Sequence, residues 1–178
     1  VCCSRSNKRA DVDPSKIGQV VMGNVIHTDP RDMYLSRNAA IKGGIPIETP
    51  SYTLNRLCSS GLQAIVCAAQ SIFCGDTDIA LGGGAESMSR SQYWLPSMRC
   101  GQRMNDGQVI DAMVGALSDP FDSCHMGVSA ENVASRREIS REEQDQLAVE
   151  SHQRANRATE EGCFKEKILP ISIKQKNR

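Results

Sequence analysis

Apolar residues in the first half of the chain follow two patterns that succeed each other along the sequence. Short apolar runs predict strands, and apolar residues at three- and four-residue spacing predict helices. The runs predict strands over residues 17–26, 50–57 and 78–81. Residues 31–42 and 62–73 carry apolar side chains at three- and four-residue spacing, and glycines follow both segments, so we predict two helices there. The order of strand, helix, strand, helix, strand is typical of an α/β fold with a largely parallel sheet and helices on both faces.

The second half of the chain is less regular. Residues 87–126 contain several prolines and glycines and no clear period, which predicts a long functional loop or an insertion that contacts another subunit. Residues 127–137 look helical, and residues 140–143 form a capping box that begins a long polar helix. A final strand is predicted over residues 168–173.

The composition argues against two classes of partner. Lysine plus arginine and aspartate plus glutamate both number 21 among 178 residues, so the formal net charge is zero. Bulk electrostatics therefore predicts no binding to nucleic acid or to a membrane surface. No run of about 18 apolar residues occurs, so we also expect no membrane-spanning helix.

Eight cysteines are scattered along the chain without a Cys-x-x-Cys pair, and we expect no signal peptide because the first five residues have no apolar core region. We interpret them as reduced thiols, which predicts a cytoplasmic protein, with a mitochondrial or peroxisomal matrix as the alternative. The chain begins with Val1 instead of methionine, so we interpret its start as a processed or incomplete end. His27, His125 and His152 show no ligand spacing with the cysteines, so no metal site is expected.

Cys58 lies where the second predicted strand ends and the second predicted helix begins. The first N–H groups of a helix lack partners inside it and carry partial positive charge, which stabilises a thiolate and makes it a better nucleophile. The apolar stripe that follows, with Leu62, Ile65 and Phe73 among its members, predicts a buried helix. The alternative interpretation is that Cys58 is a small buried residue, the commoner fate of an intracellular cysteine.

Three consecutive glycines, Gly82 to Gly84, follow the third predicted strand. They lack the lysine of a P-loop and the spacing of a dinucleotide-binding fingerprint, so a phosphate site is only weakly indicated. We predict a tightly packed turn instead.

Four segments of the chain occur in an order that matches one enzyme family. They are Asn55-x-x-Cys58-x-Ser60-Gly61, Gly83-Gly84-Ala85-Glu86-Ser87-Met88-Ser89, His125-Met126-Gly127 with Ala130-Glu131-Asn132, and Ile139-Ser140-Arg141-Glu142-Glu143-Gln144-Asp145. With these segments, the chain resembles the thiolase family of acetyl-CoA acetyltransferases and 3-ketoacyl-CoA thiolases. The resemblance runs from about Asp13 to Lys174 and concerns only the N-terminal half of that family.

The resemblance implies a ping-pong acyl transfer through an acyl-Cys58 intermediate. Acetyl-CoA or acetoacetyl-CoA would be substrates, and coenzyme A would take part as a substrate without a separate cofactor. Leu117, His125 and Met126 would line the channel for the pantetheine and acyl groups. A role of His125 as a catalytic acid or base is an alternative hypothesis. Residues 93–109 resemble the loop through which many thiolases form tetramers, so the full-length form is expected to be a homo-oligomer, either a dimer or a tetramer.

The resemblance also implies a domain organisation. Residues 1–86 and 127–178 would form an incomplete thiolase N-terminal domain with a mixed, mostly parallel sheet and helices on both faces. Residues 87–126 would be a loop region, the start of an inserted loop domain, with the oligomerisation and coenzyme A channel segments. The family's first strand, in the middle of its sheet, has no apolar counterpart in residues 1–10. We therefore predict that the strands at 17–26 and 78–81 lack a shared neighbour and expose unpaired edges.

Two catalytic motifs of the family, Gly-His-Pro and Cys-x-Gly-Gly-Gly, do not occur in these 178 residues. The chain alone is therefore expected to be inactive, and two hypotheses follow. It is part of a thiolase-type acyltransferase, or it is a non-catalytic half-protein that binds intact thiolase subunits. A third hypothesis is a condensing enzyme of the ketosynthase type, which shares the fold and a helix-capping cysteine. The matches at residues 83–89 and 125–127 argue against it.

Overall fold

The computed structural model describes residues 2–172 of the chain. The chain divides into two compact units, Val1–Ser118 and Asp119–Arg178. The domain boundaries that the sequence suggests, at residues 86 and 127, stay a prediction.

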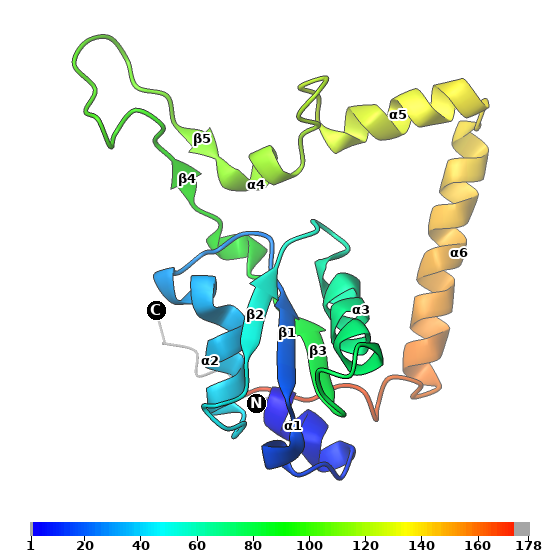
Figure 1. Ribbon diagram of the computed structural model, residues 1–178. Coiled ribbons are helices and arrows are strands. Elements are labelled where there is room, and N and C mark those ends of the chain that lie inside the picture. Colours follow the sequence, from blue (N-terminus) through cyan, green and yellow to red (C-terminus); the bar gives the residue numbers. More distant parts are fainter. Residues whose placement is uncertain (1, 173–178) are drawn as a thin grey trace. The chain divides into compact units, whose positions relative to one another are not determined.

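A three-stranded parallel sheet forms the centre of the first unit (Figure 1). Its strands are β1 (Gln19–Gly23), β2 (Ser51–Leu54) and β3 (Ala80–Gly84), in the order β2-β1-β3. All three lie within or beside the segments predicted as strands. The prediction of a mixed sheet is wrong for the described residues, because both neighbours of β1 run parallel to it.

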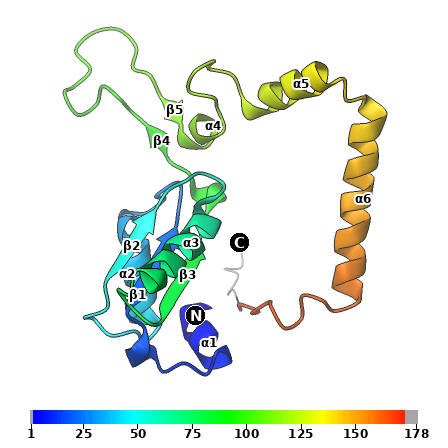
Figure 2. The ribbon, with the colours of Figure 1, turned by 45° about the vertical axis from the view of Figure 1, so that its right-hand side comes forward.

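Two longer helices cover opposite faces of this sheet, as predicted. Helix α2 (Leu35–Lys42) begins after the 3-10 helix η2 (Pro30–Tyr34), and Gly43 ends it. Helix α3 (Ser60–Phe73) follows the turn that contains Cys58. Figure 2 shows α3 on one face of the sheet and α2 on the other. Two shorter 3-10 helices, η1 (Pro14–Lys16) and η3 (Met88–Arg90), complete this part of the unit.

The core consists of two small clusters, one on each face of the sheet. Val20 of β1 is fully buried and packs with Ala40 of α2, whereas the next residue, Val21, is fully buried against Ala64 and Ala68 of α3. Successive side chains of a strand point to opposite faces, so this alternation places α2 and α3 on different sides.

As predicted, no strand among the described residues lies between β1 and β3, but the prediction that this leaves their facing edges unpaired is wrong. β1 and β3 pair directly in parallel along five residue pairs, from Gln19 with Ala80 to Gly23 with Gly84. The first residues of the chain form helix α1 (Cys2–Arg9), where the sequence indicated no element. Its mixed polar and basic sequence, with little apolar periodicity, gave no signal for a helix.

The predicted burial of the apolar stripe on α3 is also wrong. The helix buries Ser60, Ala64 and Ala68, whereas Leu62 is 67% exposed and Phe73 is 89% exposed. The reason is the distance between the helix and the sheet, which is too short for large side chains.

Glycines of strands β1 and β3 set that short distance. A Cβ atom on Gly82 would lie 2.9 Å from the Cα atom of Ile65, and one on Gly23 would overlap the carbonyl carbon of Ser60. The three consecutive glycines therefore belong to strand β3 and not to a turn, which corrects the prediction. Gly82 and Gly84 allow close packing of the α3 backbone onto the sheet, whereas a Cβ atom on Gly83 would meet the side chain of Met22.

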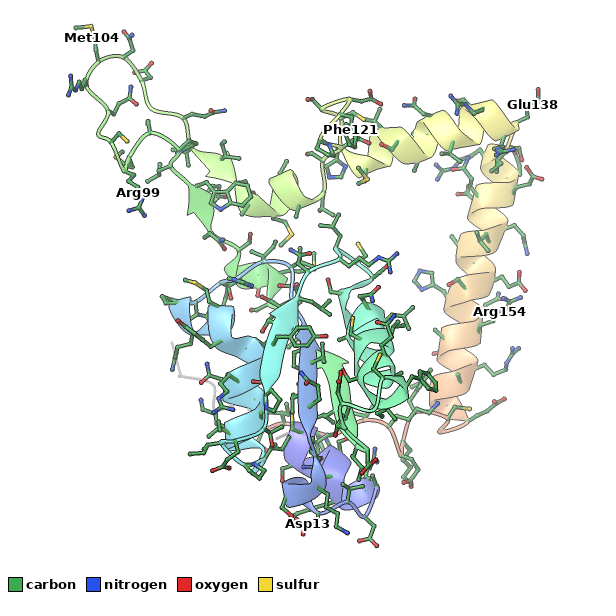
Figure 3. The ribbon with its side chains drawn as sticks, viewed as in Figure 1. Asp13, Arg99, Met104, Phe121, Glu138 and Arg154 are labelled. Carbon is green, nitrogen blue, oxygen red and sulfur yellow. The ribbon has the colours of Figure 1, made fainter. Side chains whose placement is uncertain are left out.

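The segment predicted as a long loop contains short elements. Strands β4 (Tyr93–Trp94) and β5 (Ile110–Asp111) pair antiparallel, and helix α4 (Ala112–Ala116) follows with Asp111 as its N-cap. Arg99 and Met104 lie in the loop that joins the two strands (Figure 3).

The second unit consists mainly of two helices that were predicted from the sequence. They are α5 (Met126–Arg137) and α6 (Arg141–Glu160), and Ser140 and Glu143 form the predicted capping box of α6. The strand predicted over residues 168–173 is wrong for residues 168–172, which have no regular structure. Pro170 cannot donate to a strand ladder, and Ile168 is 64% exposed. Residue 173 lies outside the described residues.

The glycine contact predicts a large difference between two alanine substitutions. Gly23→Ala should lower the free energy of unfolding by about 1–3 kcal/mol, because the added methyl group meets backbone atoms of α3 that cannot turn aside. Gly61→Ala is the matched control, since its Cβ atom would meet nothing within 4 Å. Urea unfolding followed by circular dichroism measures both effects. Equal midpoints for the two variants would contradict the role of the close contact.

Candidate active site

The turn between β2 and α3 presents Cys58, and two polar side chains hold it. Asn55 accepts a hydrogen bond from the N–H of Leu57 at 2.9 Å through its Oδ1 atom. The Ser60 hydroxyl accepts from the N–H of Arg56 at 2.9 Å and donates to the carbonyl of Leu57 at 2.6 Å. These bonds explain why the motif around Cys58 contains an asparagine and a serine at these spacings.

The backbone of the turn is strained next to the cysteine. Leu57 has a φ of 48°, in the left-handed region that a branched side chain seldom adopts. The bonds from Asn55 and Ser60 compensate for this strain, which costs on the order of 1 kcal/mol. Cys58 itself is exposed and directly precedes Ser59, the N-cap residue of α3.

The first turn of α3 leaves backbone donors unpaired near Cys58. Within the described part of the chain, no hydrogen-bond acceptor meets the N–H groups of Gly61 and Leu62. Together with the dipole of a 14-residue helix, these groups favour negative charge at this end.

Cys58 lines a cavity of about 450 Å³ in the first unit. The cavity opens at the carboxyl ends of β1 and β3, where ligand sites of open α/β sheets lie. Most of its wall is apolar, and Leu117 is part of it. The lining residues are Gly23, Asn24, Val25, Ile26, Leu57, Cys58, Ser60, Gly61, Gly84, Ala85, Glu86, Met88, Met113, Ala116 and Leu117. A cavity of this size is typical of a small-molecule site.

The structure thus brings together two of the four predicted site residues, Cys58 and Leu117. His125 and Met126 belong to the second unit and are not among the residues that line this cavity. The Nδ1 atom of His125 accepts a hydrogen bond from the N–H of Gly127 at 3.1 Å and caps α5, which Met126 begins. Their place in a coenzyme A channel stays a prediction.

Two polar residues of the cavity wall were missed in the sequence. Asn24 follows β1, and Glu86 lies two residues after β3. The signal for Glu86 was its position after the glycines of a strand end, but the strand end itself was predicted three residues too early. The signal for Asn24 was weaker, because a polar residue after a strand is common in loops.

The sequence matches the family model for the thiolase N-terminal domain over residues 3–178. The chain belongs to the thiolase family. Over 166 residues it is 58% identical to the beta-ketothiolase of Cupriavidus necator, an alignment that covers 93% of this chain and 42% of that protein. An acetyl-CoA acetyltransferase of Chromobacterium violaceum is 43% identical over 170 residues, covering 95% of this chain and 43% of the relative. The chain therefore spans about two fifths of the length of these thiolases.

Solved thiolase structures have the same fold. The acetyl-CoA acetyltransferase of Bacillus anthracis superimposes with a TM-score of 0.91 at 39% identity, covering 99% of this chain and 44% of that one. Human mitochondrial 3-ketoacyl-CoA thiolase in complex with CoA gives a TM-score of 0.91 at 36% identity, covering 95% of this chain and 43% of that one. The predicted fold of a thiolase N-terminal domain is thereby confirmed.

Residues 2–172 contain neither a cluster of metal ligands nor a membrane-spanning helix. No three His, Cys, Asp or Glu side chains among them are grouped closely enough to hold a metal ion. No helix in that range is both long enough and apolar enough to cross a bilayer.

The position of Cys58 predicts a difference in thiol reactivity within one helix. Cys58 precedes the N-terminus of α3 and Cys74 caps its C-terminus, and both are exposed. Since the helix dipole favours negative charge only at the N-terminus, Cys58 should react with iodoacetamide near neutral pH about two- to fivefold faster than Cys74. Peptide mass spectrometry at timed intervals measures both rates.

Cys3 provides an internal reference for this experiment. It is buried, and burial raises the pKa of the Cys3 thiol, so it should be alkylated more slowly than either residue. Equal rates for Cys58 and Cys74 would count against activation of Cys58 by the helix.

Proposed function

We propose that this chain carries the nucleophile of a thiolase-type acyltransferase, in which Cys58 takes an acyl group from a coenzyme A thioester. One observation carries the proposal. Cys58 is exposed at the N-terminal end of a helix, on the wall of a largely apolar cavity at the carboxyl ends of parallel strands. The thiolase relatives and the thiolase structure in complex with CoA support the choice of a coenzyme A thioester.

The chemistry at Cys58 is an acyl transfer between two sulfur atoms. The Cys58 thiolate attacks the thioester carbonyl, and a carbon–sulfur bond to Cys58 forms while the carbonyl oxygen becomes negatively charged. Collapse of this intermediate breaks the bond to coenzyme A, which leaves as a thiolate and takes up a proton. In the second half of the reaction, acetyl-CoA loses a proton from its α-carbon to a base that these residues do not supply. The α-carbon then bonds to the acyl carbon while the bond to Cys58 breaks, which gives a 3-ketoacyl-CoA and the free Cys58 thiolate. Alternatively, the sulfur of coenzyme A takes the acyl group and Cys58 is again the leaving group.

The surroundings of Cys58 suit this step. The unpaired N–H groups of Gly61 and Leu62 and the dipole of α3 favour the negative charge that develops beside the cysteine. Met88, Met113 and Leu117 provide apolar wall against which an acyl chain or the pantetheine arm packs. Such a wall also excludes water, which would otherwise hydrolyse the acyl-cysteine.

Completion of the reaction needs more groups than this chain contains. The family's Gly-His-Pro and Cys-x-Gly-Gly-Gly motifs do not occur in the 178 residues. We therefore propose that these residues alone accept an acyl group but do not turn over. His125 and Met126 are proposed to line the coenzyme A channel of the full-length thiolase, and residues 93–109 its oligomer contact.

The proposal predicts single acetylation of the chain at one cysteine. Incubation with acetyl-CoA should add one acetyl group at Cys58, detected by peptide mass spectrometry and absent from Cys58→Ala. Thiolysis of acetoacetyl-CoA should be several orders of magnitude below that of an intact thiolase, because the partner base of the nucleophile is missing. An absorbance assay that follows the consumption of acetoacetyl-CoA measures the turnover.

Three outcomes would contradict this proposal. Equal acetylation of exposed cysteines such as Cys74 and Cys163 would show that Cys58 has no special role. Normal turnover that Cys58→Ala abolishes would contradict the predicted inactivity of the chain. If Cys58 is not acetylated and the chain forms stable mixed oligomers with an intact thiolase, the alternative of a non-catalytic binding half is favoured.

A further inference from the structure

Three loops that are distant in the sequence meet at the end of the sheet where Cys58 lies. They follow β1, β2 and β3, and hydrogen bonds connect all three. The N–H of Asn24 donates to the carbonyl of Leu54 at 3.0 Å, and the N–H of Ala85 donates to the carbonyl of Gly23 at 3.1 Å. The geometry of the Cys58 turn therefore depends on residues well outside its own motif.

The carboxylate of Glu86 is the most connected group at this junction. Its Oε2 atom accepts from the N–H of Val25 at 2.8 Å. Its Oε1 atom accepts from the N–H of Ile26 at 3.2 Å and from the side-chain amide of Asn24 at 3.0 Å. Three donors from one loop, 60 to 62 residues away in the sequence, thus converge on one side chain.

The loop that Glu86 holds is in turn bonded to the cysteine turn. The side-chain amide of Asn55 donates to the carbonyl of Val25 at 3.2 Å, while its Oδ1 atom accepts from the N–H of Leu57 at 2.9 Å. Asn55 therefore fixes Leu57, the residue in the left-handed conformation, against the backbone of Val25. Both amide atoms of Asn55 are used, so its orientation is determined by the loop.

We propose that Glu86 is a positioning residue for Cys58, acting through the backbone of Val25 and the side chain of Asn55. The role rests on the proposed function of Cys58 as the nucleophile. Glu86 holds the loop, the loop carbonyl orients Asn55, and Asn55 holds Leu57 in the conformation that presents Cys58 beside the end of α3. Glu86 also lines the cavity, but its three bonds direct it toward backbone donors.

The carboxylate charge matters for this role. Hydrogen bonds from backbone N–H groups to an ionised carboxylate are roughly twice as strong as neutral ones. A glutamine at the same place has one oxygen only, and its NH₂ group would face the N–H of Val25, two donors in opposition. Glu86→Gln therefore releases the middle of the loop while it preserves the size of the side chain.

The test compares the alkylation rates of two cysteines in the same chain. In Glu86→Gln, the ratio of the Cys58 rate to the Cys74 rate should fall below that of the unchanged chain, from the expected two to five toward about one. Hydrogen exchange should increase in peptides that cover residues 24–26 and 55–60, and not in residues 35–42 of α2. A purely structural role would change stability throughout the sheet and leave the rate ratio in the folded protein unaltered.

Glu48→Gln is the matched control. Glu48 is exposed and makes no hydrogen bond or ion pair with any part of the chain that the structure describes, so the rate ratio and the exchange pattern should not change. The double variant Glu86→Gln with Asn55→Ala should have the same ratio as Asn55→Ala alone, because both act on one path.

Three results would overturn the proposal. One is a folded Glu86→Gln chain with the wild-type rate ratio, and another is additive effects in the double variant. If Glu86→Gln does not fold, Asn55→Ala tests the same path, since Asn55 is an exposed residue in the middle of it. The third result is a wild-type ratio of the Cys58 and Cys74 rates in Asn55→Ala. Neither alkylation nor exchange needs coenzyme A, so failure of Cys58 acetylation by acetyl-CoA would reject the proposed function without affecting this test.

Discussion

The close contact between the backbone of α3 and strands β1 and β3 is the constraint on which the rest of the first unit depends. Gly23 and Gly82 leave no room for a Cβ atom beneath the first turns of the helix. The helix therefore meets the sheet through small residues, with Ala64 and Ala68 buried. Because the N-terminal end of the helix is fixed this way, the preceding turn is fixed too. The place of Cys58 is thus determined by two distant glycines. Gly23 of β1 lies 35 residues before Cys58 in the sequence, and Gly82 of β3 follows the helix.

Around this contact, polar groups determine the detail of the site. Packing of α3 on glycine fixes where the helix begins, but it does not decide the conformation of the five residues that precede it. Asn55 and Ser60 do so locally, and Glu86 holds the loop to which Asn55 is bonded. The strained φ of Leu57 is tolerated because these bonds specify it from both sides. A nucleophile in a single, well-defined position is what acyl transfer requires, since small displacements of a reacting atom reduce rates strongly.

The sequence predicted those parts of the fold that depend on local periodicity and chain order. The strands, α2, α3 and the capped helix α6 have strong apolar or capping signals, and Cys58 was found from its place between a strand and a helix. It did not predict which side of α3 is buried, because apolar periodicity favours the stripe with Leu62 and Phe73. That stripe is exposed, because the glycines of β3 let the helix backbone lie so close to the sheet that large side chains do not fit between them. The roles of Glu86 and Asn24 were missed because they depend on long-range hydrogen bonds, and the position of Glu86 after a strand end does not by itself indicate its partners.

The two sides of α3 have separate physical roles. The side with small residues sets the position of the helix and of Cys58, because backbone contact with glycine is rigid and specific. The other side carries large apolar residues, Leu62, Ile65, Ile72 and Phe73, which are 41–89% exposed. Full burial of each such side chain would contribute about 1.5–3 kcal/mol. That face therefore adds little to stability within the described chain. The geometry of the cysteine turn does not depend on it, because the glycine contact and the hydrogen bonds of the turn already hold Cys58 in place. Position and the burial of large apolar side chains are thus separable here: the glycine contact and the Glu86–Asn55 path specify where Cys58 lies, independently of how much apolar surface the helix buries.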